Sequence, residues 1–161
     1  MEQQDDVYPG YGFSSHGGYG VAHHRQAIET LGVTPLHRLS FAPLKKYQKT
    51  TKEIGDEGES AATNYLIQNG HVILDRNWKT KFCEIDIVSE QKGIVYFTEV
   101  KYRKSDAQGG GIAAITPKKL QQMKFAAEYY AVQKKLVTPL KLAVVTVSGA
   151  PARVEQFLEI E

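Results

Sequence analysis

Asp86, Glu99 and Lys101 lie in two short apolar runs, and their types and spacing suit metal-dependent hydrolysis of a phosphodiester bond. The runs cover residues 82–90 and 94–102, and both are rich in Ile, Val and Phe with period-two alternation. Such runs predict β-strands. The short polar segment between them predicts a hairpin that brings the three side chains together.

The relative position of these side chains depends on the turn. If the loop is the two-residue segment Lys92-Gly93, Asp86 falls directly opposite Glu99 on the antiparallel partner strand. Because side chains alternate along a strand, Lys101 then shares a face with Glu99 and with Asp86. A slip of one residue would place Asp86 on the other face.

Two carboxylates that face each other across a sheet repel, unless a cation lies between them. Hard divalent cations such as Mg²⁺ bind few carboxylates together with waters and phosphate oxygens. Lys101 could then offset charge on a phosphate. On spacing alone, a solvated face with a cross-strand ion pair is the more common arrangement. The apolar neighbours weaken this alternative without displacing it, because they predict central strands that are covered on both faces, where a charge needs a reason.

Glu59 supplies a third carboxylate from a predicted helix over residues 54–69. It precedes Ala62 and Leu66 by three and seven residues, so it borders the apolar stripe and is expected to point towards the sheet. The alternative is that Glu59 only interacts favourably with the helix dipole, as an acidic residue near the start of a helix does.

The remaining elements follow from periodicity and from helix start and stop signals. Thr116-Pro117 is a typical helix start, and Gly70 is typical of a helix end. The order α-β-β-β-α-β-β predicts an α/β domain with a mixed central β-sheet flanked by helices. The predicted elements are a helix over Ile54–Asn69, strands His71–Lys79, Phe82–Glu90 and Ile94–Tyr102, a helix from Pro117 to about Lys135, and strands Leu140–Ser148 and Arg153–Ile160.

The composition divides the chain into two parts. Residues 1–48 are rich in Gly and Tyr and predict a disordered or loosely docked tail, with a short helix over 23–33. Residues 49–161 carry the periodic patterns of a folded domain. The net charge of +2 permits a polyanionic partner but does not require one. A single cysteine, the absence of a long apolar run and an acidic start to the chain predict a cytoplasmic protein without a membrane partner.

An ordered set of residues in this sequence resembles the YraN-like family. Members of this family are predicted endonucleases related to archaeal Holliday-junction resolvases, within the wider PD-(D/E)xK, restriction-endonuclease-like group. The resemblance covers roughly residues 51–160. The residues that carry it are Gly58-Glu59, Ala62, Tyr65-Leu66, Gly70, Ile73-Leu74, Arg76-Asn77-Trp78, Glu84-Ile85-Asp86-Ile87-Val88, Glu99-Val100-Lys101, Arg103 and Thr116-Pro117-Lys118-Lys119.

The resemblance implies a restriction-endonuclease-like core with a four-stranded mixed sheet, so that residues 49–161 would form a nuclease-like domain. It implies that Asp86 and Glu99 ligate Mg²⁺ or Mn²⁺, that Lys101 is the catalytic lysine, and that Glu59 assists the metal site. Glu84 is a weaker candidate beside this set.

Basic residues follow the site in the sequence and predict a nucleic-acid-binding surface formed by Arg103, Lys104, Lys118 and Lys119. The alternative is an ordinary lysine-rich helix surface. The expected partner is DNA, with branched or single-stranded regions as candidate substrates, and a homodimer is allowed by analogy with resolvases.

The primary hypothesis is therefore a metal-dependent DNA endonuclease. The first alternative is a non-catalytic nucleic-acid-binding or DNA-processing partner protein that retains the nuclease fold. The second is a scaffold whose Tyr/Gly-rich tail recruits a partner.

Overall fold

The computed structural model describes residues 2–16, 20–40, 42–103 and 115–160. The chain separates into two compact units, residues 1–49 and 50–161, next to the predicted boundary after residue 48. Among the described helices, none is long and apolar enough to cross a membrane.

In the described part of the first unit, short helices surround a small core. The helices are α1 (Glu2–Val7), α2 (Phe13–His16), α3 (Ala22–Leu31) and the 3₁₀ helix η1 (Ala42–Tyr47). Helix α3 agrees with the short helix predicted over 23–33. Four buried apolar residues form the core: Tyr11, Phe13, Ala27 and Ile28. So small a core buries little apolar surface, as expected for a loosely ordered segment.

The second unit has the predicted order of elements. It consists of α4 (Thr51–Gln68), β1 (Val72–Lys79), β2 (Glu84–Gln91), β3 (Ile94–Arg103), α5 (Pro117–Lys134), β4 (Leu140–Ser148) and β5 (Arg153–Ile160). The strands form one mixed sheet in the order β1-β2-β3-β4-β5, in which β3 and β4 are parallel and the other neighbours are antiparallel. The sheet therefore has one strand more than the four-stranded core that the resemblance implies.

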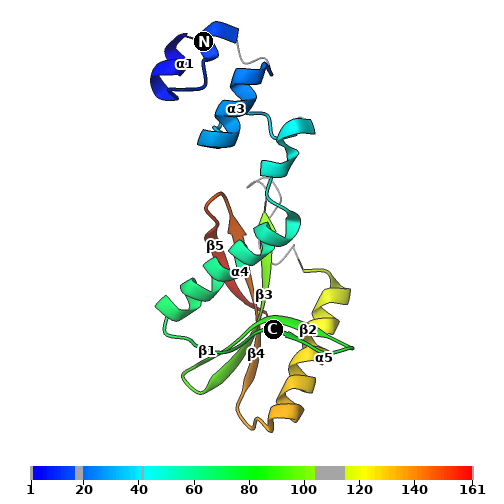
Figure 1. The fold of residues 1–161 in the computed structure, drawn as a ribbon. Helices are drawn as coiled ribbons and strands as arrows, with labels where there is room; N and C mark the ends of the chain where they lie inside the picture. Colours follow the sequence, from blue (N-terminus) through cyan, green and yellow to red (C-terminus); the bar gives the residue numbers. More distant parts are fainter. Residues whose placement is uncertain (1, 17–19, 41, 104–114, 161) are drawn as a thin grey trace. The chain divides into compact units, whose positions relative to one another are not determined.

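The two long helices cover opposite faces of this sheet (Figure 1). Helix α5 packs on one face, where its Met123 and Tyr130 join Phe97 of β3 in a buried cluster. Helix α4 packs on the other face, where its Leu66 joins Val145 of β4. The central strands are therefore covered on both sides, as their apolar sequences predict.

Local signals in the sequence account for where the two long helices begin. Thr50 caps α4: its Oγ1 accepts a hydrogen bond from the backbone N–H of Glu53, and the Glu53 carboxylate accepts one from the backbone N–H of Thr50. Thr116 caps α5 through its side chain alone: its Oγ1 accepts a hydrogen bond from the backbone N–H of Lys119, and Pro117 occupies the first helical position. These caps set the start of α5, and with it the direction of its first-turn side chains.

The β2–β3 hairpin has the predicted two-residue loop. Lys92 and Gly93 both have positive φ, 51° and 77°, which matches the favoured turn between two twisted strands. The paired residues run from Gln91↔Ile94 to Ile87↔Thr98, in the register that the sequence predicts.

Gly58 lets α4 lie close to the sheet. A Cβ at Gly58 would lie 3.0 Å from Cγ2 of Val147 and 3.7 Å from Cδ2 of Tyr102, whereas a Cβ at Gly55 would meet nothing within 4 Å. We expect Gly58→Val to lower the free energy of unfolding by about 1–3 kcal/mol through overpacking. The matched change Gly55→Val should raise it by up to about 0.5 kcal/mol, because Val has a somewhat higher helix propensity than Gly. Urea unfolding measures both, and equal effects at the two positions would contradict the close packing.

Candidate functional site

Strands β2 and β3 part at Asp86. In a continued ladder the amide of Val100 would face the carbonyl of Ile85. Instead, Val100 N–H donates a 2.8 Å hydrogen bond to Oδ2 of Asp86. The Asp86 carboxylate therefore replaces the Ile85 carbonyl as the acceptor for Val100 N–H. The point at Asp86 and Glu99 where β2 and β3 separate is called the fork below. The side chains of Asp86 and Glu99 lie close to each other, as the sequence predicts. The last regular pair of the two strands is Ile87↔Thr98, one step before them.

The divergence of the strands also decides which face of the sheet Ile85 occupies. Continuous alternation predicts that Ile85 shares the face of Ile87 and Val100. Ile87 and Val100 do lie in the cluster under α4, but Ile85 packs in the cluster under α5. The reason is that β2 leaves the regular ladder at Asp86, so period-two alternation does not carry across the fork.

Glu99 is the buried acidic centre of the site, with 7% of its surface exposed. Its Oε1 lies 2.8 Å from Nζ of Lys101 and its Oε2 lies 2.9 Å from Nζ of Lys119. A carboxylate that is buried this far is costly unless its charge is paired. The two lysines supply that pairing next to Asp86.

Lys101 comes from the same strand and Lys119 from the first turn of α5. Residues 97, 99 and 101 share one face of β3 because side chains alternate, and Phe97 identifies that face as the one under α5. Lys119 precedes the buried Met123 by four residues, so it points towards the same face. Lys119 was expected to bind nucleic acid; the structure places its ammonium group on a site carboxylate.

The surroundings of Asp86 make its carboxyl group harder to ionise than usual. Burial raises its pKa from 3.8 to about 6, and the nearby negative charges of Glu99 and Glu59 add to the rise. The Val100 hydrogen bond and the positive charge of Lys119 oppose it. Glu59 comes from α4 and Lys119 from α5, so charges from both sides of the sheet act on this one carboxyl group.

The donor set fits a hard divalent cation in its chemistry. Asp86 and Glu99 are oxygen donors that repel each other, and a cation between them would remove the repulsion. Mg²⁺ needs only one or two protein carboxylates when waters and substrate phosphate complete its coordination. Within residues 2–16, 20–40, 42–103 and 115–160, no three His, Cys, Asp or Glu side chains converge on a common metal position, so Glu59 is not shown as a direct ligand.

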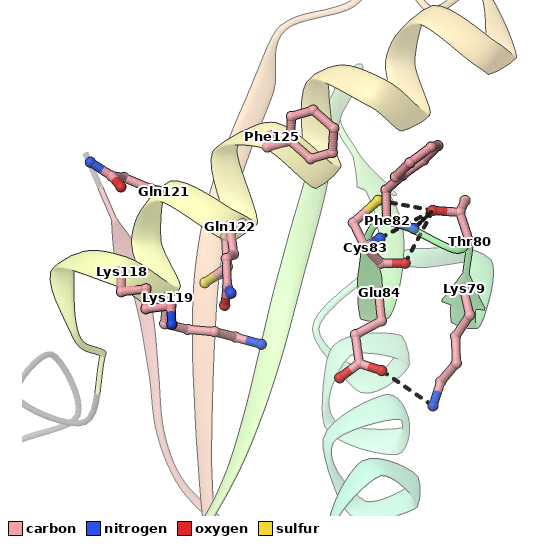
Figure 2. A pocket seen from close by; sticks show the side chains of 11 residues that line it. Lys79, Thr80, Phe82, Cys83, Glu84, Lys118, Lys119, Gln121, Gln122 and Phe125 are labelled. Carbon is pink, nitrogen blue, oxygen red and sulfur yellow. Dashed lines mark hydrogen bonds and ion pairs between the residues drawn. The ribbon is translucent and has the colours of Figure 1, made fainter.

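The other predicted site residues have different positions. Glu84 does not join the carboxylates, because its Oε2 forms a surface ion pair with Nζ of Lys79 at 3.3 Å (Figure 2). Arg103 is the last residue of β3 and is half-buried. Lys118 is exposed on α5, next to Lys119. Lys104 lies outside the described residues.

A groove of about 610 Å³ adjoins the site, and no sequence prediction named it. It lies between α5 and the β1–β2 connection (Figure 2). Phe82 and Phe125 line it and are 62% and 48% exposed. In the sequence, each of these phenylalanines follows a lysine in a polar segment. This pattern alone does not show whether an aromatic side chain is exposed or buried.

The family model and the similar proteins name the same protein family. The model of the uncharacterised protein family UPF0102 matches residues 58–147. A UPF0102 protein of Neisseria meningitidis serogroup C is 38% identical over 97 residues, which is 60% of this chain and 84% of the relative. UPF0102 proteins of Fusobacterium nucleatum and Clostridium tetani are 40% and 41% identical over 85 residues, 53% of this chain and 71% and 70% of the relatives. These names state the family and no activity.

The matched segment contains the fork carboxylates, both lysines and Glu59, and it begins after the first unit ends. The matched region exceeds half of the chain, and the relatives are covered over more than two thirds of their length. This chain therefore belongs to family UPF0102, the YraN family.

Proposed function

We propose that this protein is a divalent-metal-dependent endonuclease that hydrolyses phosphodiester bonds in DNA. The observation that carries the proposal is the fork between β2 and β3, where buried Glu99, paired with two lysines, lies beside an Asp86 whose pKa is raised. Buried like charges with a strongly shifted pKa are costly for a fold, and such arrangements are concentrated at functional sites.

Each side chain has a distinct task in this proposal. Asp86 and Glu99 would hold a Mg²⁺ or Mn²⁺ ion, and Glu59 would contribute negative charge from α4. When bound, such a cation stabilises negative charge on a phosphate and activates a water for attack. Lys101 is 36% exposed, so its ammonium group can reach a phosphate while it stays paired with Glu99. Lys119 holds the second Glu99 oxygen and orients the carboxylate.

A DNA cleavage assay with the full chain tests the proposal. We expect branched, nicked or linear DNA to be cut with Mn²⁺ or Mg²⁺ and to remain intact with a chelator. Asp86→Asn should cut at least about a hundredfold more slowly, because even outer-shell changes at metal sites cost 10- to 100-fold. The control Glu128→Gln changes an exposed carboxylate elsewhere on α5 and should cut at the wild-type rate. No cleavage with either metal, or equal cleavage by Asp86→Asn, would overturn the proposal.

One observation favours a second candidate, a DNA-binding protein that kept the fold without catalysis. Both Glu99 oxygens already have lysine partners, so the carboxylate is neutralised without a metal. This candidate predicts salt-sensitive DNA binding that persists in chelator and in Asp86→Asn, with no cleavage. Binding that requires the metal would count against it.

A further inference from the structure

We propose that the groove between α5 and the β1–β2 connection binds unpaired nucleotides, and that the substrate therefore carries a single-stranded segment next to the bond that is cut. The second part rests on the proposed nuclease function, while the groove can be tested without any cleavage.

The first support is a set of aromatic rings at the groove. The ring centroids of Phe82 and Phe125 lie 6.3 and 5.9 Å from that of Tyr129, which also contacts Trp78 at 6.1 Å. Tyr129, which does not itself line the groove, thus contacts both exposed phenylalanines and keeps them near each other. Large exposed apolar groups that gather in this way indicate a binding surface.

The β1–β2 connection holds its aromatic ring in a structured turn. The Thr80 hydroxyl oxygen accepts hydrogen bonds from the backbone N–H groups of Phe82 and Cys83, both at 3.1 Å. Thr80 N–H donates in turn to the Cys83 carbonyl at 2.9 Å. Because these hydrogen bonds define the backbone before ligand arrives, little entropy is lost when a flat ligand stacks on Phe82.

The second support is the charge of the groove. Lys79, Lys118 and Lys119 line it together with the acidic residue Glu84. Lys79 pairs with Glu84 and Lys119 pairs with Glu99, so the exposed Lys118 adds positive charge beyond these pairs. Lys81 lies over the Phe82 ring at 4.8 Å. Aromatic faces interleaved with lysines match the alternation of bases and phosphates along a nucleic-acid strand.

The third support is the position of the groove relative to the fork. Lys119 lines the groove and also binds Glu99, so one side chain belongs to both. Figure 2 shows Lys119 extending from α5 into the space between the helix and the β1–β2 connection. A strand whose bases stack in the groove would present its backbone to the carboxylates.

These observations favour unpaired nucleotides over a continuous duplex. In a duplex the faces of each base are covered by its neighbours, so Phe82 and Phe125 could not stack on them. The groove volume of about 610 Å³ also lies within the range of roughly 300–1,000 Å³ that is typical of small-ligand sites. This size suits a few unpaired nucleotides better than a duplex.

The experiment measures binding by the full chain with Asp86→Asn added, so that cleavage does not interfere. The probes are a blunt duplex and the same duplex with an unpaired tail that contains 2-aminopurine. We expect the tailed duplex to bind tighter, and Phe82→Ala with Phe125→Ala to weaken it by about tenfold or more. Binding of the blunt duplex should stay within about twofold.

Two sets of variants serve as controls. Phe82→Tyr with Phe125→Tyr keeps the ring faces and should retain tail binding and the change in 2-aminopurine fluorescence. Val132→Ala with Val137→Ala removes exposed apolar groups that do not line the groove and should bind like the parent. Tails of DNA and of RNA with the same sequence distinguish the two sources of unpaired nucleotides, and the tighter one is assigned to the groove.

The outcomes separate this inference from the proposed function. If the alanine variants bind the tailed duplex as well as the parent does, the inference is overturned even when the wild type cuts DNA. If tail binding depends on both phenylalanines and no metal supports cleavage by the wild type, the groove inference stands and the nuclease proposal fails.

Discussion

Replacing Glu99 with glutamine should slow DNA cleavage by at least about a hundredfold without weakening DNA binding. The variant loses a carboxylate that holds the proposed cation, while Gln keeps the size of the side chain. Removal of a negative charge beside Lys101 and Lys119 leaves both ammonium groups available to phosphate. Single-turnover cleavage and fluorescence anisotropy on the same DNA, compared with wild type and Glu128→Gln, measure the two effects separately.

The fold should survive this change. The lysine side chains are 36% and 23% exposed, so water can solvate them when Glu99 no longer carries charge. Circular dichroism and urea unfolding check this point. Cleavage by Glu99→Gln at the wild-type rate would remove Glu99 from the catalytic machinery, and a parallel loss of DNA binding would assign it to DNA recognition.

Replacing Asp86 with asparagine should stabilise the protein at neutral and alkaline pH. The folded-state pKa of Asp86 is about 6, above its ordinary value of 3.8. The stability linked to this group is therefore fully present below pH 3.8 and is lost as pH rises through 6. A shift of this size corresponds to about 2–3 kcal/mol. Asn stays neutral and can still accept the Val100 hydrogen bond, so the variant should not incur that loss.

Urea unfolding in chelator at several pH values provides the measurement. The stability gap between Asp86→Asn and wild type should be about 2–3 kcal/mol at pH 8, should narrow below pH 6 and should close near pH 4. Glu128→Gln, at an exposed position, should differ from wild type by less than about 0.5 kcal/mol throughout. A variant that is less stable than wild type at pH 8 would contradict the electrostatic cost at Asp86.

Addition of Mn²⁺ connects the two predictions. A cation that binds only the folded wild type stabilises it by mass action, so the gap at pH 8 should shrink as the metal concentration rises. Asp86→Asn should respond less. The negative charges that lower the stability of the metal-free protein would then favour binding of the cation. Active sites commonly show such a trade-off between stability and function.

Much of the second unit could be predicted from local sequence. Lys92-Gly93 determined the hairpin loop and its register, because both residues adopt the positive φ values that the turn requires. Thr116-Pro117 determined where α5 begins, and strands Leu140–Ser148 and Arg153–Ile160 were predicted with the bounds that the structure has. These features depend on neighbours within a few residues, so the pattern of side chains is sufficient.

The arrangement of the site required the tertiary structure. Sequence spacing placed Asp86 near Glu99, but it could not show that the Asp86 carboxylate accepts the Val100 amide and ends the strand pairing. It also could not show that Glu84 turns to Lys79 on the surface. Whether Val100 N–H donates to the Ile85 carbonyl or to the Asp86 carboxylate depends on the path of the backbone. The sequence alone does not specify that path.

Residues far apart in sequence complete the site. Lys119 reaches Glu99 only because β3 and β4 pair in parallel, which requires a crossover that lays α5 over the Glu99 face. Phe82 and Phe125 share a groove for the same reason. The sequence by itself determined which carboxylates and lysine meet on the hairpin. Only the packing of α5 on the sheet decided which distant lysine neutralises Glu99 and which aromatic rings stay exposed beside it, because such contacts depend on long-range packing and not on local propensity.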